Sequence, residues 1–165
     1  MTRTLILMRH AKSNWDSPVA GDHARPLNDR GRRSATAMGN WMRTQGWIPD
    51  QVLSSSSART RETFARLGFV IAGEFTDALY HAGPDQMRQT LAQTSGETVL
   101  LLGHNPGIAE FAEQLVQLGP DHPRFYDYPT GATLVVKFDI DNWDLLKPGT
   151  GIVLDFTVPR DLKID

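Results

Sequence analysis

Short, largely apolar runs recur along the chain and predict the strands of a buried sheet. Runs without polar alternation are typical of strands that are covered on both faces. The last run differs, because Ile152, Leu154, Phe156 and Val158 alternate with other residues and predict a single buried face. The predicted strands cover residues 4–8, 51–54, 98–102, 132–138 and 151–158.

Between these strands the apolar residues recur at helical spacing. The predicted helices cover residues 28–45 before Gly46, a segment ending at Gly68, a segment opened by Pro84, and a segment from the 103–107 turn to Gly119 and Pro120. Residues 14–26, 73–83, 121–131 and 139–149 lack regular spacing and predict loops or turns. Strands that alternate with helices predict one α/β domain over residues 1–165, with a mostly parallel central sheet flanked by helices.

Composition narrows the function classes. The 165 residues carry 17 Lys and Arg against 19 Asp and Glu, a net charge of −2, without any basic run. This balance argues against binding to nucleic acid or to an anionic membrane. No apolar stretch approaches the roughly 20 residues that span a bilayer, so we expect a cytoplasmic protein. The absence of Cys excludes disulfides and thiol nucleophiles.

Arg and His residues follow three of the predicted strands. Arg9 and His10 come after the first strand, Arg59 after the second and its serines, and His104 after the third. Ligands of open α/β sheets bind outside the carboxyl ends of the strands, so we expect these four side chains to meet there. An Arg guanidinium matches phosphate oxygens bidentately, and a neutral imidazole can attack phosphorus. The sequence therefore predicts a site for a phosphate dianion.

The turn at residues 103–107 leads into a helix, whose first N–H groups favour anions. Asn105 in this turn has two interpretations, a ligand of the phosphate or a residue that holds the turn. Lys12 is either a solvated cation or one that attracts anions to the site.

The sequence resembles the histidine phosphatase (phosphoglycerate mutase-like) superfamily from Thr4 to about Thr133, and within it the SixA-like phosphohistidine phosphatases. Three motifs in the right order make this resemblance specific. They are Leu7-Met8-Arg9-His10, Ser55-Ser56-Ser57-Ala58-Arg59-Thr60-Arg61-Glu62-Thr63 and Gly103-His104-Asn105. The SixA-like features are Arg9-His10-Ala11-Lys12-Ser13, Arg25-Pro26-Leu27-Asn28 with Gly31-Arg32, and Gly103-His104-Asn105-Pro106.

The resemblance implies that His10 is the nucleophile that becomes phosphorylated and that water then hydrolyses the phosphohistidine. Arg9, Arg59 and His104 would hold the phosphoryl oxygens and stabilise the charge of the transition state. We expect neither a metal nor another cofactor, because the two guanidiniums supply the positive charge.

The chain departs from the superfamily pattern at two places. Ala11 stands where most members have Gly, as is usual in the SixA-like group. No carboxylate clearly matches the general acid of the phosphomonoesterases, and Asp77 and His81 are only weak candidates. Expelling imidazole needs such an acid less than expelling an alkoxide. We therefore expect phosphohistidine on a protein, such as a phosphotransfer domain, as the substrate, in a shallow, open site.

Two other functions remain open at this point. One is a phosphomonoesterase that acts on a small phosphorylated metabolite, and the other is a non-catalytic phosphate-binding module. The sequence does not determine the physiological substrate or the oligomeric state.

Several polar and aromatic residues have simpler interpretations. We expect a structural ion pair for Arg25, and solvated side chains for His23 and His122 in their polar loops. Trp15 and Tyr80 either line the mouth of the site or merely pack. Asp16, Asp22 and His23 lack the spacing of a metal site.

Overall fold

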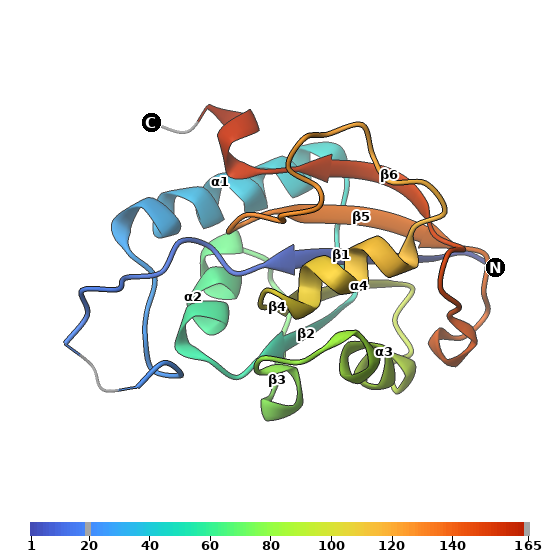
Figure 1. Ribbon diagram of the computed structural model, residues 1–165, viewed down its shortest axis with the longest axis horizontal. Helices are drawn as coiled ribbons and strands as arrows, with labels where there is room; N and C mark the ends of the chain where they lie inside the picture. The colour runs from blue at the N-terminus through green and yellow to red at the C-terminus, as the bar shows by residue number, and fades with distance from the viewer. Residues whose placement is uncertain (19–20, 164–165) are drawn as a thin grey trace.

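The computed structural model describes residues 1–18 and 21–163, and a six-stranded sheet lies at its centre (Figure 1). The strand order is β3-β2-β4-β1-β5-β6. Strands β1 to β4 pair in parallel, whereas β5 pairs antiparallel with both β1 and β6. This confirms the predicted mostly parallel sheet. The strands are β1 (Arg3–Arg9), β2 (Gln51–Ser55), β3 (Glu74–Thr76), β4 (Thr98–Gly103), β5 (Thr133–Phe138) and β6 (Ile152–Thr157).

Helices cover both faces of this sheet, α1 and α2 one face and α3 and α4 the other (Figure 1). Asn28 caps α1 by accepting a hydrogen bond from the Gly31 backbone N–H. Gly46 and Gly68 end α1 and α2 in the left-handed conformation, as predicted. The helices are α1 (Asp29–Gln45), α2 (Ala58–Leu67), α3 (Pro84–Ala92) and α4 (Gly107–Leu115), with 3-10 helices η1 (Asp77–Leu79), η2 (Trp143–Leu145) and η3 (Pro159–Leu162).

Strand β1 lies near the middle of the sheet and is buried on both faces. Leu5 and Leu7 pack in the core cluster under α3 and α4, and Ile6 and Met8 pack in the cluster under α1 and α2. All four side chains are fully buried. A run of apolar residues without alternation is what such a strand requires.

Helix α4 ends earlier than the sequence predicts, at Leu115 instead of Gly119 and Pro120. Val116 is extended and forms a β-bridge with Gly151. The Gly151 backbone N–H donates to the Leu115 carbonyl, and the Gln117 N–H donates to the Gly151 carbonyl. Pairing with a distant segment thus satisfies the backbone groups that a further helical turn would have used.

The predicted alternation of β6 is wrong in its first half. Val136 pairs with Val153 and Val135 pairs with Asp155, so Leu154 is the extra residue of a β-bulge. The bulge exchanges the two faces of the strand, so that Val153 packs against the core. Ile152 and Leu154 are consequently exposed, at 41% and 39%.

Two segments that were predicted to be irregular contain short elements. Residues 73–83 hold β3 and η1, and residues 139–149 hold η2. Elements of three residues are too short to leave a periodic signal in the sequence. No described helix has the length and apolar character needed to cross a membrane. The predicted cytoplasmic location stays a prediction.

Tyr128 fastens the loop before β5 to the middle of the sheet. Its hydroxyl donates to the Leu7 carbonyl and accepts from the Leu134 backbone N–H, and the side chain is fully buried. Tyr128→Phe leaves the Leu7 carbonyl and the Leu134 N–H without this hydrogen-bond partner. We therefore expect the free energy of unfolding to fall by about 1–3 kcal/mol in urea titrations. Tyr126→Phe is the matched control, because Tyr126 is 62% exposed. Equal stability of the two variants would contradict this role.

Candidate active site

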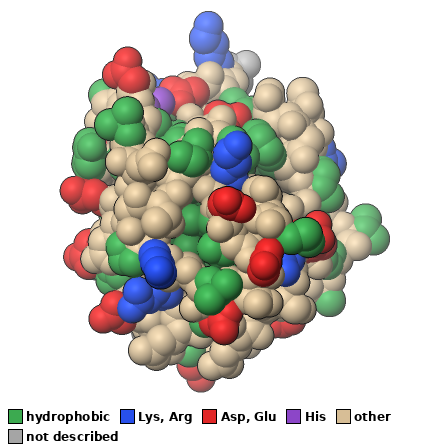
Figure 2. All heavy atoms as spheres, turned by 90° about the vertical axis from the view of Figure 1, so that its right-hand side faces the viewer, with side chains coloured by type: hydrophobic (Ala, Val, Ile, Leu, Met, Phe, Trp, Pro, Cys, Tyr) green, Lys and Arg blue, Asp and Glu red, His purple; other side chains and the backbone are tan. Residues whose placement is uncertain are grey.

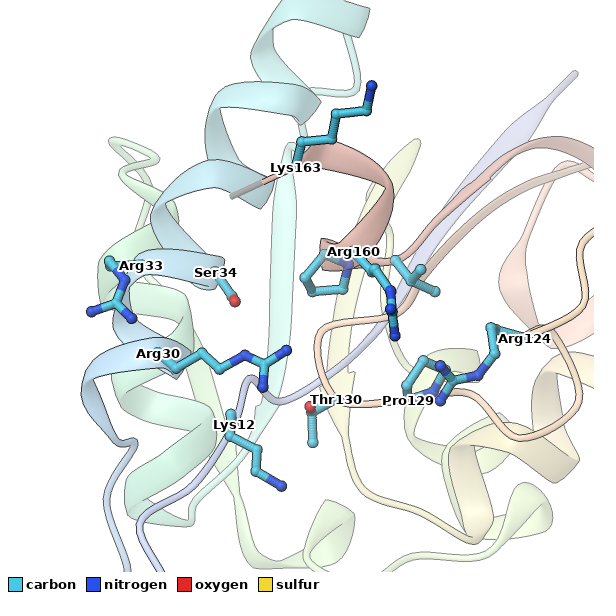
Figure 3. Close-up of a pocket in the computed structure, with 11 residues that line it drawn as sticks. Lys12, Arg30, Arg33, Ser34, Arg124, Pro129, Thr130, Arg160 and Lys163 are labelled. Atoms are coloured by element: carbon cyan, nitrogen blue, oxygen red, sulfur yellow. The ribbon is translucent and has the colours of Figure 1, made fainter. Parts of the chain in front are cut away.

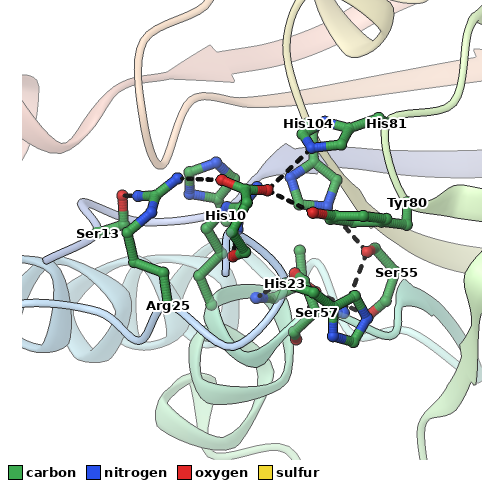
Figure 4. A network of polar contacts seen from close by, with 12 residues as sticks. His10, Ser13, His23, Arg25, Ser55, Ser57, Tyr80, His81 and His104 are labelled. Carbon is green, nitrogen blue, oxygen red and sulfur yellow. Dashed lines mark hydrogen bonds and ion pairs between the residues drawn. The ribbon is translucent and has the colours of Figure 1, made fainter. Parts of the chain in front are cut away.

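The ends of three parallel strands bring the predicted residues together. Arg9 ends β1 and is followed by His10, and His104 follows β4. Strand β2 leads through its serines into α2, which carries Arg59. Because β4 lies between β1 and β2, the four side chains line one hollow of about 240 Å³. The polar contacts around this site are drawn in Figure 4.

His10 has a defined tautomer. Its Nδ1 lies 2.7 Å from the Ala11 carbonyl oxygen, which can only accept, so Nδ1 carries the proton. The lone pair is therefore on Nε2. Burial lowers the pKa of His10 to about 3, and the nearby Arg9 and Arg59 guanidiniums add to this. At neutral pH His10 is an uncharged imidazole with an unprotonated Nε2, as a nucleophile requires.

His104 is also neutral, since burial and the neighbouring His10 lower its pKa to about 2. Its Nε2 lies 2.8 Å from the Ser55 hydroxyl, which accepts a hydrogen bond from the Ser57 N–H. When this hydroxyl donates its own proton to Nε2, the ring proton lies on Nδ1. Nδ1 is buried without a partner among the described residues, so it can donate to an anion.

Two guanidiniums supply the positive charge of the site, Arg59 fully buried and Arg9 half-buried. Arg9 donates to the Tyr128 carbonyl, and Arg59 donates to both the carbonyl and the carboxylate of Asp22. Burial and the adjacent Arg59 lower the pKa of Arg9. The Nε–H groups of Arg9 and Arg59 lack an acceptor among the described residues. Unsatisfied donors next to paired cations fit a pocket for an oxyanion.

Asp22 is the main residue that the sequence did not indicate. Its carboxylate accepts from Arg25 at 2.8 Å, Arg59 at 3.0 Å and Tyr80 at 2.5 Å, and lies 2.9 Å from His81 Nε2. Burial raises the pKa of Asp22, but the hydrogen bonds outweigh burial and hold the pKa below its usual value. Asp22 stands in an irregular loop, so no spacing in the sequence could connect it to Arg59. Asp22 and His81 both line the hollow, so the site has side walls that the expected shallow, open site would lack.

The structure separates the two candidate acids. His81 lines the hollow, with its ring centroid 5.1 Å from that of His104. Asp77 is 93% exposed, accepts from the Ser56 hydroxyl and does not line the hollow. His81 reaches this position because Ala82, the next residue, packs closely against the start of α4 at Gly107. A Cβ on Gly107 would lie 1.8 Å from the Ala82 carbonyl oxygen, so a larger residue there would push this segment away. Of these two candidate acids, His81 alone lines the hollow.

Asn105 lines the hollow but uses its donors elsewhere. Its Nδ2 donates to the carbonyls of Asp127 at 2.9 Å and Tyr128 at 3.1 Å. The remaining Oδ1 only accepts, so it repels phosphate oxygens. The geometry thus favours a residue that holds the turn over the predicted phosphate ligand.

Thr63 ties the first motif to the second. The Ala11 N–H donates to the Thr63 hydroxyl at 3.1 Å, and that hydroxyl donates to the Arg59 carbonyl at 2.7 Å. This pair of hydrogen bonds gives a physical reason for a Thr four residues after Arg59 in the second motif. It fixes the backbone beside His10 relative to the helix that carries Arg59.

Trp15 and Tyr80 have different positions at the site. Trp15 lines the hollow, and the Arg25 guanidinium lies 3.6 Å from its ring centroid. Arg25 forms the expected ion pair, with Asp22. Tyr80 packs edge-on against His104, with ring centroids 5.5 Å apart. Trp15 thus lies at the mouth of the site, and Tyr80 positions Asp22.

Two histidines that were predicted to be solvated contact other side chains. His23 Nε2 lies 2.9 Å from the Ser56 hydroxyl, although the side chain is half exposed. His122 Nε2 lies 2.8 Å from the Asp161 carboxylate. Their partners are distant in the sequence, so the loop context alone suggested solvation. Within the described residues, no group of three or more His, Asp or Glu side chains is arranged to hold a metal ion.

Comparison with known proteins identifies the family. Residues 5–80 match the histidine phosphatase superfamily (branch 1). An uncharacterized protein of Mycobacterium tuberculosis (strain H37Rv) is 31% identical over 160 residues, which cover 93% of this chain and 100% of that protein. The chain belongs to the histidine phosphatase superfamily. It is therefore a phosphatase, as the Arg and His residues at the strand ends predict.

Solved structures of this superfamily share the whole fold. A candidate phosphohistidine phosphatase SixA from Nakamurella multipartitia is 30% identical, with a TM-score of 0.85 over 96% of this chain and 97% of that one. A protein histidine phosphatase SixA complexed with tungstate has a TM-score of 0.77 at 22% identity, over 96% and 99% of the two chains. These likenesses confirm the phosphoglycerate mutase-like fold.

The buried histidines of this phosphatase should make its stability depend on pH. The pKa values of His10 and His104, about 3 and about 2, lie below the ordinary value of 6.5. The unfolded chain therefore binds more protons below pH 6.5, and stability falls as the pH is lowered. We expect a loss of about 1 kcal/mol per pH unit for each histidine between pH 6 and pH 4.5 in urea titrations. The double variant His10→Gln/His104→Gln should flatten this slope, and an unchanged slope would contradict it.

The Asp22 carboxylate accepts from one terminal nitrogen of Arg59 and places a negative charge in the hollow, which opposes the binding of an anion there. In Asp22→Asn the negative charge is lost, so inorganic phosphate should inhibit at a concentration at least about 10-fold lower, since a hydrogen bond to a charged group contributes about 1.5–3 kcal/mol. Competitive inhibition of phosphatase turnover measures this. Asp127→Asn is the control, because Asp127 pairs with Arg124 outside the hollow. Weaker phosphate inhibition in Asp22→Asn would sink the idea.

Proposed function

We propose that this phosphatase removes the phosphoryl group from phosphohistidine on a protein, through a phosphohistidine intermediate on His10 and without a metal ion. The observation that carries the proposal is the neutral His10, with its Nε2 free beside the guanidiniums of Arg9 and Arg59. A residue that only bound phosphate would be better protonated. A neutral imidazole there serves attack on phosphorus.

Three unpaired donors support a role in holding the transferring phosphoryl group. The Nε–H groups of Arg9 and Arg59 and the Nδ1–H of His104 lack acceptors among the described residues. Such fixed donors stabilise the charge that spreads over the phosphoryl oxygens in the transition state. The structurally similar SixA bound to tungstate, itself a tetrahedral oxyanion, supports an oxyanion pocket here.

The reaction proceeds in two transfers. In the first, a bond forms between His10 Nε2 and phosphorus, the substrate N–P bond breaks, and the leaving imidazole nitrogen takes a proton from solvent or from His81. In the second, water attacks phosphorus, the bond to Nε2 breaks, and phosphate leaves. The water proton goes to solvent or back to His81, and His10 returns to its neutral form.

The choice of phosphohistidine depends on the leaving group. Among the described residues, Asp22 is the single carboxylic acid that lines the hollow. Its pKa is held below its usual value, so Asp22 is ionised and cannot donate a proton. An alkoxide needs a strong proton donor, whereas an imidazole leaves readily once it is protonated. The similarity to SixA structures agrees with this choice.

His81 favours a second candidate, a phosphomonoesterase for a small phosphorylated metabolite. It lines the hollow, and its Nε2 lies 2.9 Å from the Asp22 carboxylate. A protonated His81 could serve as the acid that an alkyl ester requires.

The deciding experiment measures phosphate release in EDTA from a phosphohistidine-bearing phosphotransfer domain and from phosphoserine. We expect kcat/KM for the phosphotransfer domain to be at least about 100-fold higher, and to change little in His81→Ala. Comparable turnover of phosphoserine that falls in His81→Ala would support the metabolite phosphatase instead. Loss of both activities in EDTA would contradict metal independence.

A further inference from the structure

A groove lined by cations adjoins the catalytic hollow. Its volume is about 510 Å³, and it lies between the start of α1, the loop before β5 and the C-terminal η3 segment. Figure 3 shows Arg30 reaching into it from α1, Arg160 from the opposite side and Thr130 between them. Six of the 17 Lys and Arg residues of the chain line this groove, namely Lys12, Arg30, Arg33, Arg124, Arg160 and Lys163.

Most of these cations lack an acidic partner. Arg124 pairs with Asp127 at 2.9 Å, whereas no other cation of the groove forms an ion pair within residues 1–18 and 21–163. The remaining five are also exposed. In a chain of net charge −2, such a cluster creates a local positive field that can steer an acidic partner. The end of the molecule that carries the N-terminus instead intersperses acidic and basic side chains (Figure 2).

The groove and the catalytic hollow share a wall. Lys12 and Thr130 line both. A substrate whose phosphoryl group lies beside His10 therefore has its adjoining surface over the groove.

We propose that the groove docks the acidic side chains that lie beside the phosphohistidine on the surface of the substrate protein. The proposal depends on the phosphohistidine function argued above. It adds that the substrate protein is negatively charged around its phosphohistidine. A built small-molecule site has a few buried polar groups that fix the ligand. Here Ser34 is the single buried polar residue of the described lining, and the cations stand in solvent. Mobile, exposed cations around a concave surface suit the carboxylates of a protein, which need charge complementarity more than fixed geometry.

The test compares two phosphohistidine peptides that differ only in the residues flanking the phosphohistidine, several glutamates in one and glutamines in the other. The wild type should show a KM about 10-fold lower for the glutamate peptide at low salt, and the difference should shrink as salt is added. Arg30→Glu/Arg160→Glu should abolish this preference. This double variant and the wild type should hydrolyse phosphoramidate, a small substrate with the same N–P bond, at equal rates.

The control for net charge is Arg66→Glu/Lys137→Glu. Both residues are exposed and line neither the groove nor the hollow. This variant changes the net charge by the same amount and should keep the preference for the glutamate peptide. An equal loss in both double variants would mean that only the total charge matters and would overturn the proposal.

A binding measurement tests docking in the groove independently of catalysis. The unphosphorylated glutamate peptide should bind the wild type, measured by fluorescence anisotropy, and bind Arg30→Glu/Arg160→Glu about 10-fold more weakly. Tripolyphosphate is the competing probe: if it binds through Arg30 and Arg160 while the peptide does not, the groove takes a compact polyanion and the proposal is wrong. Hydrolysis of both peptides at equal KM would overturn the docking proposal and leave the phosphohistidine function intact. Failure to hydrolyse either peptide would count against the function alone.

Discussion

Replacing His10 with alanine should reduce phosphate release from phosphohistidine by at least about 10⁴-fold, because the reaction then has no nucleophile to accept the phosphoryl group. The measurement is single-turnover phosphate release in EDTA. With a radiolabelled phosphohistidine substrate, the wild type should carry label after rapid quenching into base, where phosphohistidine survives. His10→Ala should carry none.

The control separates the loss of chemistry from the loss of fold. His10 is 5% exposed, and truncation leaves a small cavity beside Arg9 and Arg59. The variant should keep a cooperative thermal transition, and free imidazole should restore part of its activity by occupying that cavity. His104→Ala should still acquire the label, only more slowly. A label that disappears in His104→Ala and persists in His10→Ala would exchange the two roles.

Replacing Arg59 with lysine should lower kcat/KM by about 10²–10³-fold, equivalent to about 3–4 kcal/mol of transition-state stabilisation. The charge is retained, so the loss reports geometry. Arg59 donates from two nitrogens to Asp22 and keeps a buried Nε–H for a phosphoryl oxygen. A lysine ammonium cannot supply three donors in one plane.

Arg61→Lys is the matched control on the same helix. Arg61 is exposed, donates from Nε to the Ser56 carbonyl and lies over the Phe75 ring. Its variant should change kcat/KM less than about twofold, as is usual for exposed substitutions away from the site. Arg59→Lys should also raise the concentration at which phosphate inhibits. A variant with unchanged kcat/KM would remove Arg59 from the phosphoryl clamp.

Most of the site was readable in the sequence because local pattern and topology agree there. Apolar runs predict buried parallel strands, and parallel strands place the residues that follow them at one edge of the sheet. Arg9 ends β1, and His10 and His104 directly follow β1 and β4, so their convergence needed no knowledge of loops. Arg59 lies further on, but it stands in the first turn of the helix that follows β2.

The residues that the sequence did not indicate act across long separations. Asp22 reaches Arg59 and Tyr80, 37 and 58 positions away, from a loop without periodicity. Tyr128 holds Arg9 through its carbonyl, 119 positions away. Such contacts depend on how loops pack on the finished sheet, and no local spacing records that.

The same distinction explains the errors in the fold. Helix α4 stops at Leu115 because Gly151 pairs with the backbone beyond it, and β6 changes face because Leu154 forms a bulge against β5. The sequence by itself determined the sheet, its flanking helices and the four charged or polar side chains at the strand ends, since these follow from burial and period. The tertiary structure alone decided the tautomers of His10 and His104, the place of Asp22 and the basic groove, because each depends on distances between segments that meet only after folding.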